Sequence, residues 1–238
     1  MSEIYGVIDM IKIKICGITN KKEIEYVNIL KPDYIGLVFT QSKRKVNNEI
    51  AVRLLNELNS DIKSVGVFRD NSIKEILNVI SEVKLDVIQL HGKEDLEFIK
   101  ELRKNLNQEV KIWKALSITN NDDIKKYVNK NKINENYIES FLIDGANPGS
   151  GESYSLEDLK LSINIKSKEM TLNSDSKRNK FFLAGGINEK NVLGRIEQVN
   201  PMGIDVSSGV EIIDEDGQHI KSFEKMKILI DKVRNIQG

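Results

Sequence analysis

The feature that most constrains this chain is a repeated alternation between short apolar runs typical of β-strands and stretches with helical spacing. Strands alternating with amphipathic helices imply right-handed βαβ units and a parallel sheet. The predicted strands lie at residues 12–16, 34–39, 64–68, 85–90, 110–116, 137–143, 181–184 and 203–206. The predicted helices lie at residues 21–30, about 50–58, 73–83, 94–106, 122–130, 155–164, 188–198 and 221–235.

Eight such units in 238 residues favour a closed (β/α)8 barrel, a single-domain TIM barrel, over an open doubly wound sheet. The last strand ends in D-V-S-S-G and not in a charged segment typical of a sheet edge, which also favours closure. We expect the barrel to occupy residues 12–238, after an N-terminal tail at residues 1–11. Residues 166–180 are polar and lack apolar periodicity, so they are predicted to form a solvated loop insertion.

The composition excludes several classes of partner. Lys and Arg together number 36, as do Asp and Glu, so no overall basic field indicates a nucleic acid or an anionic membrane. No apolar run approaches the roughly 18 residues that span a bilayer, and the first residues lack the basic start of a signal peptide. One cysteine excludes an internal disulfide and fits a reducing compartment. A soluble, cytoplasmic protein is expected.

Residues capable of chemistry gather at the carboxyl ends of the predicted strands, where parallel α/β folds carry their sites. Cys16 precedes Gly17, which permits close approach of a ligand, although a free cysteine is often only a small buried hydrophobe. Asp144 ends the apolar run F-L-I-D, where desolvation would suit it to donate a proton, but it could equally cap the following turn. Arg44 could grip a carboxylate or simply face solvent, and His91 could be a hydrogen-bonded wall residue.

Two glycine-containing turns follow the last two predicted strands. They are Gly185-Gly186 and Ser207-Ser208-Gly209. Turns at these positions in a barrel commonly hold a phosphate with their backbone N–H groups, although glycine also serves tight turns. Strand parity adds a prediction about the interior: if Cys16 points inward, so do Lys14 and, on the adjoining last strand, Asp205. We therefore predict a buried Lys14–Asp205 ion pair that sets the register of closure.

These segments also carry a family resemblance. The chain contains, in order, K-I-C-G-I-T, Y-I-G-L-V-F followed by S-K-R, V-G-V-F, V-I-Q-L-H-G, F-L-I-D, L-A-G-G-I and I-D-V-S-S-G-V-E. Together they resemble the phosphoribosylanthranilate isomerases of tryptophan biosynthesis over residues 12 to about 211. Composition and periodicity alone would not name this substrate.

The resemblance implies an Amadori rearrangement of N-(5-phosphoribosyl)anthranilate to 1-(2-carboxyphenylamino)-1-deoxyribulose 5-phosphate, without a metal or an organic cofactor. It implies that Asp144 is the general acid that opens the ribose ring and that Cys16 is the general base at C2. Arg44 would hold the anthranilate carboxylate, with His91 and Asp205 as further substrate-binding residues. The phosphate would be held by Gly185, Gly186, Ser207, Ser208 and Gly209. The expected partner is this small molecule, and a monomer and a homodimer both stay open.

The sequence departs from the family pattern in three places. A Pro-Gly-Ser-Gly-Glu loop at residues 148–152 replaces the usual G-G-T-G-K, the segment before the seventh strand is long, and residues 217–222 replace a G-x-K-D motif. We expect the last change to affect only a peripheral turn. Two alternatives remain: a histidine-pathway isomerase, whose acid–base pair is two aspartates, and a barrel that binds a sugar phosphate without turnover.

Overall fold

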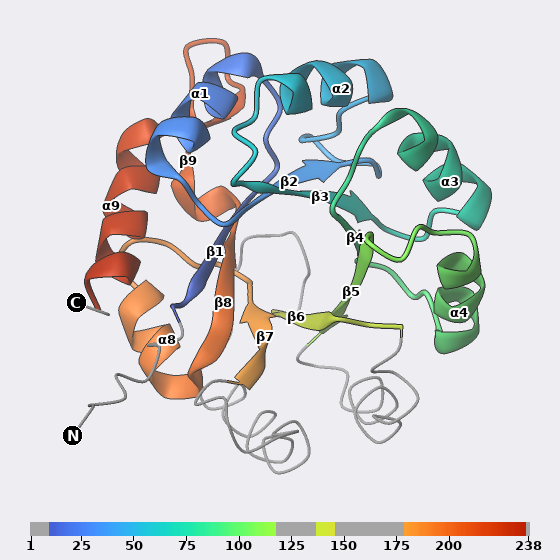
Figure 1. Ribbon diagram of the computed structural model, residues 1–238. Helices are drawn as coiled ribbons and strands as arrows, with labels where there is room; N and C mark the ends of the chain where they lie inside the picture. The colour runs from blue at the N-terminus through green and yellow to red at the C-terminus, as the bar shows by residue number, and fades with distance from the viewer. Residues whose placement is uncertain (1–9, 118–136, 146–178, 237–238) are drawn as a thin grey trace, which may run out of the picture.

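The structure is a computed structural model that describes residues 10–117, 137–145 and 179–236. Eight parallel strands close into a barrel, in which β1 pairs with both β2 and β8, and Figure 1 shows the helices outside this ring. The predicted fold class is therefore confirmed. The strands are β1 (Lys12–Cys16), β2 (Tyr34–Val38), β3 (Lys63–Phe68), β4 (Val87–Leu90), β5 (Lys111–Ser117), β6 (Ser140–Asp144), β7 (Asn179–Leu183) and β8 (Pro201–Val206).

The described helices match the apolar periodicity of the sequence and mostly begin at a capping side chain. They are α1 (Lys21–Leu30), α2 (Asn48–Asn56), α3 (Ile73–Glu82), α4 (Leu96–Lys104), α8 (Val192–Val199) and α9 (Phe223–Asn235). Asn20, for example, accepts a hydrogen bond from the Glu23 amide at the start of α1, and Ser72 forms a capping box with Glu75 in α3. The described helices contain no segment long and apolar enough to cross a membrane.

Several predicted boundaries were wrong, and other predictions fall on parts of the chain that the structure does not describe. The predicted helices at residues 122–130 and 155–164, the loop at 148–152, and most of the tail and the polar segment lie outside the described residues. The last two residues of that segment belong to β7, because backbone pairing of Asn179 with Pro201 does not require apolar side chains. Helix α8 starts at Val192 instead of 188, since the Asn188 side chain accepts from the amides of Lys190 and Asn191 and forms a turn.

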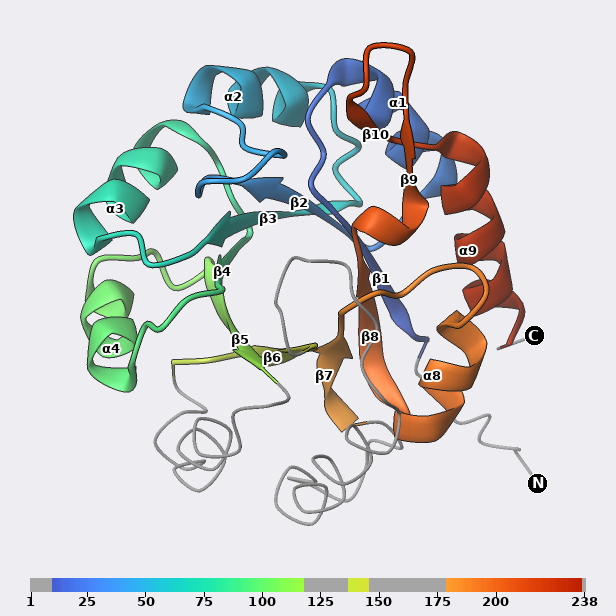
Figure 2. The same ribbon diagram turned by 180° about the vertical axis from the view of Figure 1, so that it is seen from behind.

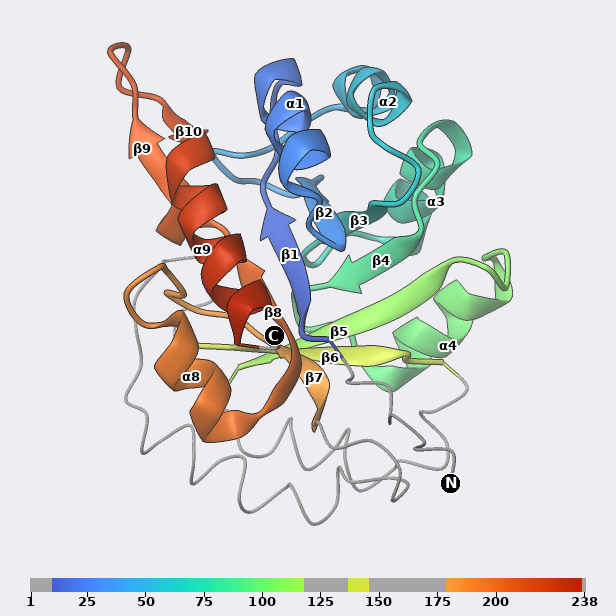
Figure 3. The ribbon, with the colours of Figure 1, turned by 60° about the vertical axis from the view of Figure 1, so that its left-hand side comes forward.

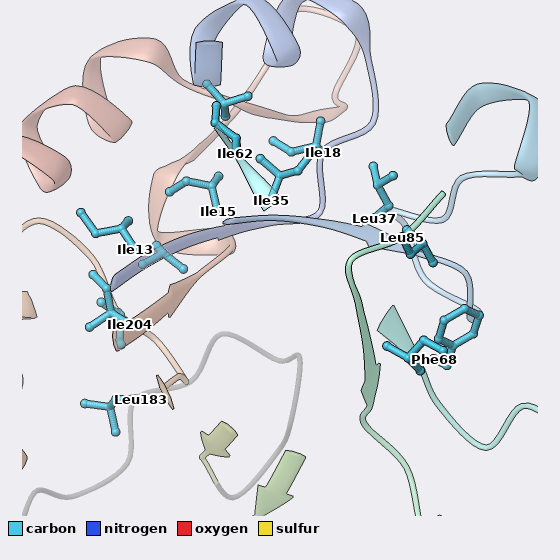
Figure 4. Close-up of a cluster of buried hydrophobic side chains, with 14 of the residues drawn as sticks. Ile13, Ile15, Ile18, Ile35, Leu37, Ile62, Phe68, Leu85, Leu183 and Ile204 are labelled. Atoms are coloured by element: carbon cyan, nitrogen blue, oxygen red, sulfur yellow. The ribbon is translucent and has the colours of Figure 1, made fainter. Parts of the chain in front are cut away.

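Apolar side chains of the described residues form two large clusters and a small third one of Cys16, Val38 and Val67. The largest cluster lies between the strands and the helices, and Figure 4 shows some of its members. Its labelled residues are Ile13, Ile15, Ile18, Ile35, Leu37, Ile62, Phe68, Leu85, Leu183 and Ile204. It extends to Ile11, which was assigned to the tail but is fully buried. Inside the barrel, Tyr34, Trp113 and Phe182 pack ring against ring, so the interior is a packed core and not a pore.

Lys14 and Asp205 form an ion pair inside the closed barrel. Lys14 pairs in register with Asp205 across the β1–β8 junction, and the Lys14 Nζ lies 2.8 Å from the Asp205 Oδ1. Both side chains are nearly inaccessible, with exposed fractions of 0% and 9%. The predicted ion pair at the point of closure is thus confirmed.

A small hairpin after β8 was not predicted. A 3-10 turn at Ser208–Val210 leads into β9 (Glu211–Ile213), which pairs antiparallel with β10 (His219–Lys221). Figure 2 shows this hairpin beside α1 and α9, and Figure 3 shows that it extends from the end of the barrel toward which β1 points. The carboxyl ends of the strands, where chemistry was expected, are therefore flanked by an additional element.

Candidate active site

A cavity of about 240 Å³ opens at the carboxyl ends of the barrel strands. Its lining comes from β1 to β4, from β6 and β8, and from loops at the carboxyl ends of the strands, including the loop that follows β7. The lining residues are Cys16, Val38, Thr40, Gln41, Ser42, Arg44, Val67, Arg69, Gln89, His91, Asp144, Ala184, Gly185, Gly186, Ile187, Asp205, Ser207 and Ser208. All the predicted site residues except Gly209 are therefore brought together around one cavity.

Cys16 lies at the end of β1, buried in a small cluster with Val38 and Val67 and close to the Lys14 ammonium. Burial raises the pKa of the Cys16 thiol, while the Lys14 ammonium opposes the shift. Burial also tends to lower the pKa of Lys14, but interactions with Asp205 and Cys16 outweigh it and the net shift is upward. Gly36 on the neighbouring strand makes room for both groups, because a Cβ atom there would lie 2.7 Å from Cys16 Sγ and 3.2 Å from Lys14 Nζ. The cavity thus presents a thiol beside a fixed ammonium group.

Asp144 ends β6 across the lining from Cys16, with a hydrogen-bond donor at one carboxyl oxygen and the His91 ring near the other. Its Oδ1 accepts from the Gly145 amide at 2.7 Å, and its Oδ2 lies 3.3 Å from the Nε2 of His91. The other ring nitrogen of His91, Nδ1, lies 2.9 Å from the side-chain nitrogen of Gln89. Asp144 thus accepts a hydrogen bond from the turn that follows its strand and also faces the cavity. Its position is therefore compatible both with capping this turn and with donating a proton to a bound ligand.

Arg44 does not face solvent. Its Nε and Nη2 donate to the two carboxylate oxygens of Glu211, at 2.5 and 2.8 Å, and its side chain is 10% exposed. Burial raises the pKa of Glu211, but the hydrogen bond from Arg44 and the charge of Lys221 lower the pKa to about 2. Glu211 is therefore a carboxylate that orients the guanidinium at the rim of the cavity.

Lys221 connects this carboxylate with the first and last strands. Its Nζ lies 2.7 Å from Glu211 Oε1 and donates to the carbonyl and hydroxyl oxygens of Ser207, and Ser207 in turn donates to the Cys16 carbonyl at 3.0 Å. Because Lys221 is only 2% exposed, burial lowers the pKa of its ammonium. The expectation that residues 217–222 form only a peripheral turn was wrong, since β10 carries Lys221 into this network.

The two glycine-containing turns adjoin each other beside the cavity. Gly185 and Gly186 both have positive φ, at 84° and 63°, which glycine adopts without strain. Gly209 does not line the cavity; a Cβ atom there would collide with the Ile187 carbonyl oxygen, so close packing of the two turns requires glycine. Within residues 10–117, 137–145 and 179–236, no group of three or more His, Cys, Asp or Glu side chains is placed to hold a metal ion.

Sequence reasoning missed the polar lining residues Thr40, Gln41, Ser42, Arg69 and Gln89, as well as Glu211 and Lys221, which contact the lining residues Arg44 and Ser207. Gln89 and Glu211 stand in the motifs V-I-Q-L-H-G and D-V-S-S-G-V-E, and Gln89 shares the parity of His91 along one strand. That parity was the available signal for Gln89. Nothing in the local pattern indicates Lys221, because the hairpin that buries it was not predicted.

Comparison with known proteins places the chain in a family. Residues 13–232 match the sequence model described as N-(5'phosphoribosyl)anthranilate (PRA) isomerase. The N-(5'-phosphoribosyl)anthranilate isomerase of Clostridium beijerinckii is 54% identical over 228 residues, which cover 95% of this chain and 99% of that protein. The chain belongs to the PRA isomerase family. It is thus an isomerase.

Solved structures of PRA isomerases have the same fold. The phosphoribosyl anthranilate isomerase of Thermotoga maritima superposes with a TM-score of 0.77 at 30% identity, covering 95% of this chain and all of that one. A PRA isomerase in complex with reduced 1-(o-carboxyphenylamino)-1-deoxyribulose 5-phosphate superposes with a TM-score of 0.71 at 28% identity, with the same coverage. A small molecule that carries both a carboxylate and a phosphate is therefore bound by a protein of this fold.

Proposed function

We propose that this chain converts N-(5'-phosphoribosyl)anthranilate to 1-(2-carboxyphenylamino)-1-deoxyribulose 5-phosphate, with Asp144 as general acid and Cys16 as general base. The observation that carries the proposal is that a carboxyl group and the only thiol of the chain line one cavity, between an arginine and two glycine-containing turns. Membership of the PRA isomerase family supports the choice of substrate.

The first step opens the ribose ring. Asp144 gives a proton to the ring oxygen, the C1–O bond breaks toward that oxygen, and the anthranilate nitrogen forms a C=N bond to C1. Two nearby groups support this role: the Gly145 amide donates to the carboxylate that remains, and His91 Nε2 lies 3.3 Å from its other oxygen.

The second step removes the proton from C2. Cys16 takes it as a thiolate, and the C–H electron pair forms the C1=C2 bond of an enolamine, which becomes the ketone when a proton moves from the C2 hydroxyl to C1. Because burial raises the pKa of the Cys16 thiol, nearby positive charges are needed to stabilise its thiolate. The Lys14 ammonium opposes the effect of burial, and the protonated Schiff base formed in the first step adds a second positive charge.

Binding uses the two ends of the substrate. Glu211 occupies the Nε and Nη2 edge of Arg44, which leaves Nη1 for the anthranilate carboxylate. At the other end, the backbone N–H groups near Gly186 and Ser208 suit a phosphate. Anion-binding groups at both ends of the cavity would hold the sugar between the acid and the base.

Loss of substrate over time tests this proposal. Purified protein should consume N-(5'-phosphoribosyl)anthranilate and form the ketose product without added metal, and inorganic phosphate should inhibit competitively. Turnover only of the aminoaldose of histidine biosynthesis would favour the alternative isomerase, which the cysteine at position 16 disfavours. Binding of either sugar phosphate without turnover would contradict the proposal and favour a binding protein.

A further inference from the structure

Gln89 is a buried polar side chain to which the proposed reaction assigns no role. It lies on β4, lines the cavity and is 0% exposed. Its side-chain nitrogen lies 2.9 Å from His91 Nδ1, whereas its Oε1 has no hydrogen-bond partner among the described residues. A buried amide oxygen without a partner costs stability, so packing alone does not account for a glutamine here.

The chemistry of the amide determines which nitrogen of His91 carries the proton. An amide nitrogen has hydrogens to donate and does not accept, so the neighbouring Nδ1 must accept and carry no proton. The ring proton then lies on Nε2, which is the nitrogen 3.3 Å from Asp144 Oδ2. Gln89, His91 and Asp144 thus lie in sequence: the Gln89 amide nitrogen contacts His91 Nδ1, and His91 Nε2 lies within ion-pair distance of the Asp144 carboxyl group.

The backbone around His91 is fixed independently of Gln89. The His91 amide donates to the Phe68 carbonyl at 2.7 Å, and the next amide, Gly92, donates to Glu94 Oε2 at 2.9 Å. Glu94 is in turn held by Lys114, a buried ammonium that also donates to the Gly92 carbonyl at 2.6 Å. With the backbone held this way, the remaining freedom lies in the imidazole ring, and Gln89 contacts that ring.

We propose that Gln89 is a positioning residue that keeps the ring proton of His91 on Nε2, directed at Asp144. The part of this proposal that concerns the reaction rests on the proposed function. When Asp144 gives its proton to the ring oxygen and the C1–O bond breaks, the new carboxylate receives the Nε2–H hydrogen bond of His91. Before that step, Asp144 must carry the proton that it donates. Each of its carboxyl oxygens has two lone pairs, so one can bind this proton while the other faces Gly145 or His91. Gln89 therefore acts through His91 and does not itself contact the reacting atoms.

The position of the proton can be observed without any substrate. The chain contains two histidines, His91 and His219, so ¹⁵N-histidine labelling gives two sets of imidazole signals, which His219→Gln assigns. In the wild type, we expect His91 Nδ1 to give the signal of an unprotonated nitrogen and Nε2 that of a protonated one. In Gln89→Glu, a carboxylate that only accepts should move the ring proton to Nδ1. His219 lies on β10, outside the cavity lining, so its signals should not change.

Kinetics test the consequence for the acid. Gln89→Glu and the apolar variant Gln89→Met should each lower kcat at least about tenfold and leave KM within about threefold, because the support is needed when charge develops on Asp144. The matched control is Val87→Ala, which removes buried volume two residues earlier on the same strand without touching His91. It should lower the melting temperature but change neither the ring proton nor kcat. Gln89→Met keeps the test open if Gln89→Glu folds poorly.

Each result decides one part. A wild-type ring with its proton on Nδ1, or an unchanged ring in Gln89→Glu, would overturn the assignment of the proton. A shifted proton with wild-type kcat would overturn the link to the acid. If the wild type does not turn over N-(5'-phosphoribosyl)anthranilate, the proposed function fails, and the NMR comparison still decides whether Gln89 sets the His91 proton.

Discussion

The absence of a side chain at Gly36 leaves the space that the thiol of Cys16, the proposed base, occupies. A Cβ atom at this position would lie 2.7 Å from Cys16 Sγ, well inside the roughly 3.5–4 Å of van der Waals contact, so the thiol would have to move. Because small displacements of reacting groups lower rates strongly, Gly36→Ala should reduce kcat about tenfold or more. Steady-state kinetics with N-(5'-phosphoribosyl)anthranilate measure this.

A second glycine provides the control. Gly194 lies within α8, and among the described residues a Cβ atom there would meet nothing within 4 Å beyond its own helix backbone. Gly194→Ala should therefore leave kcat unchanged and stabilise the fold by about 0.5–1 kcal/mol. Full activity in Gly36→Ala would show that the position of the thiol does not limit the reaction.

Glu211 should make the stability of the protein depend on acid pH. Its pKa is about 2 in the folded chain, against an ordinary value of 4.5, and its side chain is only 4% exposed. A carboxyl group with a lowered folded pKa stabilises the fold above its unfolded pKa, and that contribution disappears as pH falls through the folded pKa. A shift of this size corresponds to about 3 kcal/mol. The advantage of the wild type over Glu211→Gln in unfolding free energy should therefore shrink between about pH 5 and pH 2. An advantage that stays constant over this range would contradict the assignment.

Among the elements, the junction of β1 with β8 is the clearest test of how the barrel closes. Lys14→Met alone strands the Asp205 carboxylate inside the barrel and should cost about 3–5 kcal/mol. The double variant Lys14→Met, Asp205→Leu removes both charges and should recover most of this loss. The attraction within a buried ion pair mainly offsets the cost of removing its two charges from water, so the pair as a whole adds little to stability. Urea unfolding measures both. Wild-type stability in Lys14→Met would show that the ion pair does not support closure.

The same elements show what could be predicted from sequence. Parity along a strand has a period of two and depends only on the backbone, so it predicted the Lys14–Asp205 pair between residues 191 positions apart. The hairpin of β9 and β10 was missed because its strands are only three residues long, too short for a periodic pattern to be recognised. Its consequence, a buried Lys221 on Glu211, depends on tertiary contacts that no local pattern encodes. For Arg44, the sequence left open a carboxylate partner or exposure to solvent; in the structure it holds the carboxylate of Glu211, and its contact with the substrate carboxylate stays a prediction.

At the scale of the whole molecule, binding of phosphate should raise the thermal stability of the protein. A ligand that binds only the folded chain raises the free energy of unfolding, by about 2.7 kcal/mol at 100 times its Kd. If the turns at Gly186 and Ser208 hold the phosphate, inorganic phosphate should raise the melting temperature above that in chloride of equal ionic strength. Gly186→Val should abolish the difference, because its positive φ of 63° disfavours a branched side chain. Equal melting temperatures of the wild type in both salts would place the phosphate elsewhere.

The most direct test of the central claim is the turnover number of three proteins acting on N-(5'-phosphoribosyl)anthranilate: the wild type, Cys16→Ala and Asp144→Asn. Both side chains line the same cavity, and each is assigned one proton transfer. Removing either group should lower kcat at least about 10²-fold, the usual contribution of a general acid or base. If either variant keeps kcat within about threefold of the wild type, that residue does not carry its proton transfer, and the acid–base assignment is wrong.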